Sequence, residues 1–132
     1  MFETHVRVYY EHTDSGGVVY HSNYLNFMER CRCDWLASIG HDVVSIEEKY
    51  GLQWVVKHAE VEFHAPARLF DDLTVSCEVL QVGKVRLEVQ QAVYNQDQVL
   101  CSAHIKLATL NSTSFKLARM PDQLIAAISG GS

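Results

Sequence analysis

Three things are scarce or missing in this sequence: long apolar runs, basic residues and C-x-x-C cysteine pairs. Stretches without a charged residue are interrupted by Asn, Gln, Ser or Gly well before the ~20 apolar positions of a membrane-spanning helix. The first residues contain no cationic segment followed by an apolar one, so no signal peptide is predicted. The sequence therefore predicts no membrane insertion.

Basic residues are outnumbered, with 11 Lys and Arg against 16 Asp and Glu, for a formal charge of −5. This balance argues against nucleic acid as a partner, while a local basic patch can still bind a phosphate-bearing ligand. The four cysteines form no C-x-x-C pair and the seven histidines no H-x-x-x-H pair, so no metal site is predicted. Cysteines in a chain without a signal peptide indicate reduced thiols and a cytoplasmic location.

The length of 132 residues, with 48% apolar and 20% charged residues, is typical of one domain that buries a single core. We expect this domain to span residues 1–129. The last three residues, 130–132, have the composition of a flexible tail and are set aside.

Hydrophobic periodicity predicts one long helix and five strands. Apolar residues recur at helical spacing from Ser22 to Ile39, and Asp42 or Ser45 is a candidate cap for a short helix ending near Gly51. Alternating patterns predict strands over residues 2–10, 58–65, 73–79, 85–93 and 99–107, and Pro121 is a favoured helix start. Short connections between the later strands predict antiparallel neighbours.

One apolar helix and one antiparallel sheet must cover each other, which predicts an α+β layer. The expected architecture is a hotdog fold, in which the five-stranded sheet wraps around the long central helix.

The densest chemistry lies between Tyr9 and Tyr24, where Asp14 sits in a glycine-bearing loop before the helix. The first N–H groups of a helix lack intrahelical partners and can stabilise an oxyanion. A nearby carboxylate can attack a carbonyl carbon or deprotonate water. The same residue types also fit a turn in which Asp14 only bonds its own backbone. Residue types alone leave both interpretations open.

The run from Tyr9 to Arg30, YYEHTDSGGVVYHSNYLNFMER, resembles the signature of the 4-hydroxybenzoyl-CoA thioesterase family. It is most similar to the YbgC-type, Tol-Pal-associated acyl-CoA thioesterases, and the similarity continues through APARL at residues 65–69. The resemblance implies a thioesterase with Asp14 as nucleophile or general base. It implies that the His21 N–H polarises the thioester carbonyl, and that the His21 imidazole and Tyr10 lie in the site.

The resemblance also implies substrate contacts at Gly17 and Val18, while Arg68 and Lys57 are candidates for binding coenzyme A phosphates. Lys84 and Arg86 are weaker candidates. For Arg68, an ion pair with Asp71 or Asp72 is the competing interpretation. One departure is His12, where the subgroup usually carries aspartate, so a titratable base replaces an anion.

The family implies acyl-CoA as substrate, no cofactor beyond the coenzyme A of the substrate, and a homodimer that often forms a tetramer. Residues 56–63 would then face Asp14 of a partner copy, and an acyl carrier protein is a further candidate partner. The alternative function is a non-catalytic module on the same fold that binds acyl thioesters or acyl carrier protein.

Overall fold

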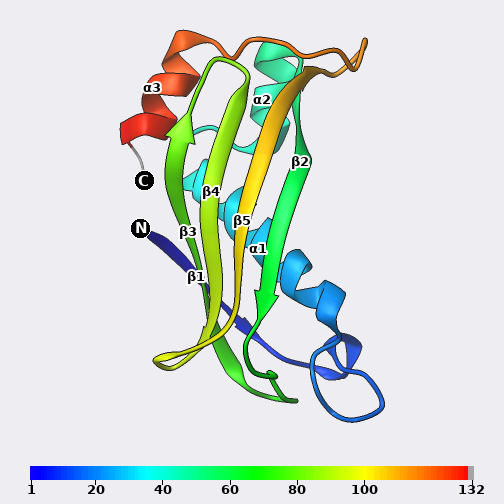
Figure 1. Ribbon diagram of the computed structural model, residues 1–132. Coiled ribbons are helices and arrows are strands. Elements are labelled where there is room, and N and C mark those ends of the chain that lie inside the picture. Colours follow the sequence, from blue (N-terminus) through cyan, green and yellow to red (C-terminus); the bar gives the residue numbers. More distant parts are fainter. Residues whose placement is uncertain (131–132) are drawn as a thin grey trace.

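A long helix lies across one face of a five-stranded antiparallel sheet in the computed structural model, which describes residues 1–130 (Figure 1). The strands are β1 (Phe2–Arg7), β2 (Leu52–Phe63), β3 (Asp72–Val82), β4 (Arg86–Asn95) and β5 (Gln98–Asn111). The helices are α1 (His21–Ser38), α2 (Val43–Tyr50) and α3 (Asp122–Gly130), with a single 3-10 turn η1 (Tyr10–His12). The predicted hotdog arrangement is confirmed.

Helix α1 buries the apolar stripe that its sequence predicts. The buried residues of α1 lie on one arc: Tyr24, Phe27, Met28, Cys31, Trp35 and Leu36. They pack on β1, β3 and β4, where Leu73, Val89 and Val93 are almost fully buried in the same core. This burial is the main source of stability, because each fully buried aliphatic or aromatic side chain contributes about 1.5–3 kcal/mol.

One polar side chain lies inside this apolar layer. Gln91 is fully buried on the inner face of β4. Its Oε1 accepts from Arg32 Nη1 at 2.9 Å, and its Nε2 donates to the carbonyls of Met28 at 3.0 Å and Ser76 at 3.3 Å. These bonds satisfy the amide and tie the middle of α1 to the sheet.

The strand order is β1-β3-β4-β5-β2, and every neighbouring pair is antiparallel. The expectation that consecutive strands are neighbours is wrong for β2, which pairs with β5 rather than with β3. Residues 64–71 instead run past the lower end of the sheet, as seen in Figure 1, to the start of β3. Strands β1 and β2 are left as the two edges.

The two short helices lie at one end of the sheet (Figure 1). Asp42 caps α2 by accepting from the Ser45 N–H at 2.9 Å, and Gly51 ends it in the left-handed region with φ +66°. Helix α3 follows Pro121 as predicted and includes Gly130. Gly131 and Ser132 of the expected tail lie outside the described residues, and the single-domain boundary stays a prediction.

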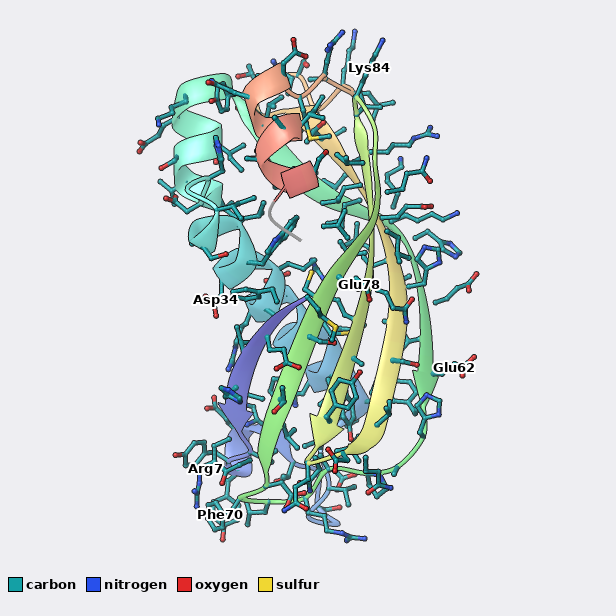
Figure 2. The ribbon with its side chains drawn as sticks, turned by 90° about the vertical axis from the view of Figure 1, so that its left-hand side faces the viewer. Arg7, Asp34, Glu62, Phe70, Glu78 and Lys84 are labelled. Atoms are coloured by element: carbon teal, nitrogen blue, oxygen red, sulfur yellow. The ribbon has the colours of Figure 1, made fainter. Side chains whose placement is uncertain are left out.

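The opposite face of the sheet carries long polar side chains, with Glu62 and Glu78 pointing away from the helices (Figure 2).

Among the cysteines, Cys33 is exposed while Cys31, Cys77 and Cys101 are buried thiols. Burial raises the pKa of Cys77 to about 12 and that of Cys101 to about 11. Within residues 1–130, no helix is both long and apolar enough to cross a membrane.

Candidate active site

The loop that carries Asp14 closes on itself before α1 begins. An antiparallel bridge joins Thr13 to Val19 at its neck. The Asp14 N–H donates to the Val18 carbonyl at 2.9 Å, and the Gly17 N–H donates to the Asp14 carbonyl at 3.2 Å. Gly17 has φ +79°, a conformation that side-chain-bearing residues avoid. The loop therefore has a defined shape that projects Asp14 into solvent.

One oxygen of the Asp14 carboxylate is used within this loop. Oδ1 accepts from the Gly16 N–H at 2.7 Å, which makes an Asx turn. Oδ2 accepts no hydrogen bond from any described residue. The turn interpretation from the sequence is therefore correct for one oxygen, while the exposed carboxylate keeps a second oxygen for chemistry.

Helix α1 begins at His21, one residue earlier than predicted, and Tyr20 occupies the N-cap position. Tyr20 makes no side-chain capping bond and the first turn contains no acidic residue, so α1 starts without a side-chain cap. The Asn23 side chain, in the first turn, donates to the His12 carbonyl at 2.9 Å, and the Asn23 N–H donates to the Tyr20 carbonyl at 2.9 Å. The N–H groups of His21 and Ser22 thus remain available to a ligand.

The His21 imidazole is exposed and lies against two aromatic rings. Its centroid is 4.3 Å from that of Tyr20 and 6.4 Å from that of Phe63 at the end of β2. His21 and Phe63 border an open pocket of about 360 Å³ beside the start of α1. Its lining residues are Val19, His21, Tyr24, Phe63, His64, Ala65 and Pro66.

The aromatic residues Tyr24 and Phe63 were not expected beside His21 from the sequence. Tyr24 was placed in the core, where burial does raise the pKa of its hydroxyl, and its Oη accepts from the Ala67 N–H at 3.0 Å. Phe63 was expected on an apolar strand face but is 53% exposed. Its ring still contacts α1, since its centroid lies 5.6 Å from that of Tyr24 and 6.4 Å from that of His21.

Arg68 is brought to the Asp14 loop by backbone pairing. An antiparallel bridge joins Val18 to Arg68, and the Val19 N–H donates to the Ala67 carbonyl at 2.9 Å. Asp71 accepts from the Arg68 backbone N–H at 2.9 Å. Among residues 1–130 the Arg68 guanidinium has no ion-pair partner, because Asp72 pairs with Arg7 at 3.7 Å.

Tyr10 does not continue β1 as predicted. It begins η1, is 75% exposed, and places its ring 5.9 Å from that of Phe70. The chain turns here because the Thr13 N–H and hydroxyl both donate to the Tyr10 carbonyl at 3.2 Å. Within the described residues, no hydrogen bond joins the Tyr10 hydroxyl to Asp14.

Lys57 is likewise separate from Asp14 in the same chain. It occupies a bulge in the middle of β2 and borders a cavity of about 520 Å³ beside the β3–β4 hairpin, at the end of the sheet away from the Asp14 loop (Figure 1). The other charged residues of this cavity are Lys84, Arg86, Glu88 and Lys106. Four basic residues against one acidic residue make this a local basic patch on an acidic chain, and Lys84 marks its hairpin end in Figure 2.

A metal centre finds no support in the described part of the chain, where no group of three or more His, Cys, Asp or Glu side chains has metal-binding geometry. The site instead combines an exposed carboxylate, an uncapped helix start and an aromatic pocket. These are the components of nucleophilic or general base attack on a carbonyl whose oxygen is held by backbone N–H groups.

Comparison with known proteins identifies the family. The model of the thioesterase superfamily matches residues 16–102. The acyl-CoA thioesterase YbgC of Haemophilus influenzae is 35% identical over 126 residues, which cover 96% of this chain and 93% of that protein. The chain therefore belongs to the thioesterase superfamily, as the motif around Asp14 predicts.

Solved structures show the same fold. A probable thioesterase from Bartonella henselae superposes with a TM-score of 0.86 at 30% identity, over 90% of this chain and 98% of its own. A 1,4-dihydroxy-2-naphthoyl-CoA thioesterase from Synechocystis gives a TM-score of 0.87 at 25% identity, over 97% and 95% of the two chains.

Proposed function

We propose that this protein hydrolyses acyl-CoA thioesters to a free carboxylic acid and coenzyme A. The observation that carries the proposal is the pairing of an exposed carboxylate, Asp14, with an α1 start that no side chain caps. Relatives named as acyl-CoA thioesterases, similar over nearly the whole chain, support it.

The thioester carbonyl would accept from the open N–H groups at the start of α1, with His21 as the first donor. One such donor typically contributes about 2.7–4 kcal/mol of transition-state stabilisation. Asp14 then either attacks the carbonyl carbon, releasing the thiolate and leaving an anhydride that water hydrolyses, or removes a proton from the attacking water. In both routes one water is consumed, the carbon–sulfur bond breaks and the thiolate leaves as coenzyme A. Tyr10 and the His21 imidazole are proposed to orient the substrate or water, with Gly17 and Val18 contacting it.

We further propose a homodimer, or a tetramer of two dimers, joined through β2. This edge strand exposes 49% of Val56 and 53% of Phe63, and an unpaired edge invites pairing with a second chain. Antiparallel pairing of two β2 strands about their middle brings the Phe63 end of one copy beside the Leu52 end of the other. Each Asp14 then faces the N-terminal half of the partner's β2, which overlaps the residues 56–63 that the resemblance implies only at Val56 and Lys57, and Lys57 lies near the two-fold axis.

The phosphates of coenzyme A are proposed to bind basic residues, with Arg68 beside the loop and the cavity around Lys57 as candidates. Lys84→Ala and Arg86→Ala should raise KM for acyl-CoA severalfold, because each removes a charge-assisted contact. They should leave KM unchanged for an acyl-N-acetylcysteamine, which has no phosphates. Lys49→Ala, on α2, is the matched control, and equal KM changes for both thioesters would remove the cavity from the proposal.

The test of the whole proposal is thiol release from a panel of short aliphatic, long aliphatic and aromatic acyl-CoAs. We expect hydrolysis of at least one of them, at a rate proportional to the enzyme concentration. Tight binding of acyl-CoA or acyl carrier protein without thiol release would instead identify the non-catalytic binding module.

Sedimentation of the same samples tests the dimer, and a monomer that still hydrolyses acyl-CoA would contradict it. A cytoplasmic location remains a prediction for fractionation of cells.

A further inference from the structure

His12, two residues before Asp14, is a buried histidine that the proposed chemistry does not use. Its exposed fraction is 4%, and its ring packs edge-on against Phe27 of α1 with centroids 5.0 Å apart. Its Nδ1 accepts from the Tyr9 N–H at 3.0 Å. Because an acceptor nitrogen carries no proton, this bond requires the neutral tautomer with hydrogen on Nε2.

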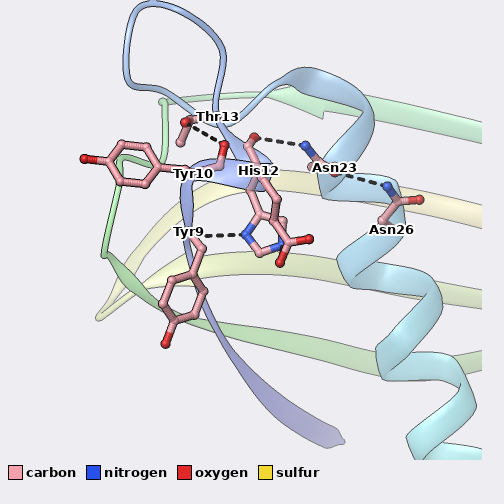
Figure 3. Close-up of polar contacts among 7 residues, drawn as sticks. Tyr9, Tyr10, His12, Thr13, Asn23 and Asn26 are labelled. Carbon is pink, nitrogen blue, oxygen red and sulfur yellow. Dashed lines mark hydrogen bonds and ion pairs between the residues drawn. The ribbon is translucent and has the colours of Figure 1, made fainter.

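The backbone of His12 joins the two sides of the loop neck (Figure 3). Its carbonyl accepts from the Tyr20 N–H at 2.9 Å and from Asn23 Nδ2 at 2.9 Å. Asn23 is itself in the first turn of α1, and its Oδ1 accepts from Asn26 Nδ2 at 3.1 Å. His12 therefore contacts three segments: the residues after β1, through Tyr9; the neck of the Asp14 loop, through Tyr20; and the first turn of α1, through Asn23.

The only charged partner of the ring within residues 1–130 is Glu11, whose Oε1 lies 3.7 Å from Nε2. That carboxylate is mostly exposed, and Nε2 has no hydrogen-bond partner. The one hydrogen bond of the ring is thus the bond that Nδ1 accepts from the Tyr9 N–H, at the bend between β1 and η1.

We propose that His12 is a positioning residue, whose neutral imidazole holds the Asp14 loop against the start of α1 through its Nδ1 acceptor. This inference rests on the proposed function for its kinetic consequence. Displacing a reacting group by about 1 Å can cost on the order of 10²-fold in rate, so the loss of one anchoring bond at the neck should affect kcat.

Two substitutions separate this role from simple packing. His12→Asn keeps an acceptor, since the amide oxygen can replace Nδ1, but it loses ring volume. His12→Phe keeps the ring against Phe27 but cannot accept from Tyr9. We expect His12→Phe to lower kcat about tenfold or more with little change in KM, and His12→Asn to stay within about threefold of the wild type. The reverse order, with the Phe variant the more active, would show that His12 only fills space.

Measurements without substrate keep the inference independent of catalysis. Imidazole ¹⁵N spectra should show an unprotonated Nδ1 and a protonated Nε2 at His12, and an Nδ1–H tautomer or an imidazolium would overturn the proposal. Exchange of the Tyr9 amide should be slow in the wild type and His12→Asn and fast in His12→Phe. His5→Phe, on the exposed face of β1, controls for the substitution itself. If the wild type releases no thiol, the proposed function fails while these spectra still decide the role of His12.

Discussion

Helices α1 and α2 begin in opposite ways. At α2, the Asp42 carboxylate accepts from both the N–H and the hydroxyl of Ser45, at 2.9 and 3.0 Å. At α1, the N-cap Tyr20 contributes no side-chain bond and no acidic residue lies in the first turn. The nearest loop carboxylate, Asp14, bonds Gly16 instead of the helix.

This difference separates a stabilising helix start from one suited to binding. Each helix presents the same unpaired N–H groups and the same positive end of its dipole. A capped start has consumed part of that capacity internally, which increases stability. An uncapped start costs stability but can bind a carbonyl oxygen, and the neighbouring carboxylate stays free to react. The comparison predicts that substitutions at α1 change rate and those at α2 change stability.

The largest effect is expected from Asp14→Asn. The amide oxygen can still accept from the Gly16 N–H, so the loop and the melting temperature should be preserved. Loss of the reactive carboxylate should lower kcat by roughly 10²–10⁴-fold. Thiol release and thermal melting on the same preparation measure both quantities, and a variant that retains more than about a tenth of wild-type kcat would remove Asp14 from the mechanism.

A smaller effect is expected from His21→Ala. The variant keeps the backbone N–H at the first position of α1 and removes only the exposed ring between Tyr20 and Phe63. We expect a loss of kcat of about tenfold, below the general acid–base range, with binding of an unreactive acyl-CoA analogue largely kept. Calorimetric titration with that analogue checks the second part, and a loss equal to that of Asp14→Asn would mean that the imidazole is essential to the chemistry.

No change in kcat is expected from Asp42→Ala, which should instead lower the melting temperature by about a few degrees. Hydrogen bonds from Ser45, the backbone N–H first, lower the pKa of Asp42. Because its folded-state pKa lies below its unfolded value near ~3.9, the stabilisation is complete above that pH and is lost as the pH falls through the folded pKa. The difference in melting temperature between variant and wild type should therefore shrink below about pH 4. A constant difference down to pH 2 would show that the charge of the cap is irrelevant.

Much of the fold follows from local pattern. The stripe from Tyr24 to Trp35 and the alternation in β3, β4 and β5 predicted the buried faces, because burial enforces periods of 3.6 and 2. The pattern failed where a polar residue is buried with partners: Gln91 satisfies its amide through Arg32 and two carbonyls that lie far away in the sequence. It failed also at Tyr10, where hydrogen bonds within a 3-10 turn override strand alternation.

The site was predictable only in part. The glycine-bearing loop before the helical stripe made Asp14 a candidate, because turn chemistry is local information. The role of His21 came from the family resemblance, and both roles stay predictions. The pairing of Val18 with Arg68 and the position of Phe63 beside His21 depend on contacts between residues far apart in the sequence. Hydrophobic periodicity does not predict such contacts. The missing cap of α1 follows from its start at His21, which the helical pattern placed one residue too late, so that Tyr20, a residue without a suitable capping oxygen, occupies the N-cap position.

The most direct test of the open helix start compares His21→Pro with His21→Ala in the thiol-release assay. Proline is well tolerated at the first position of a helix, and Tyr20 already has the extended conformation that must precede it, with φ −65° and ψ 137°. Both variants lose the imidazole, but only proline removes the backbone N–H. If that N–H holds the developing oxyanion, kcat of the proline variant should be about 10²–10³-fold below that of the alanine variant at similar melting temperature. Equal kcat values for the two folded variants would contradict the account.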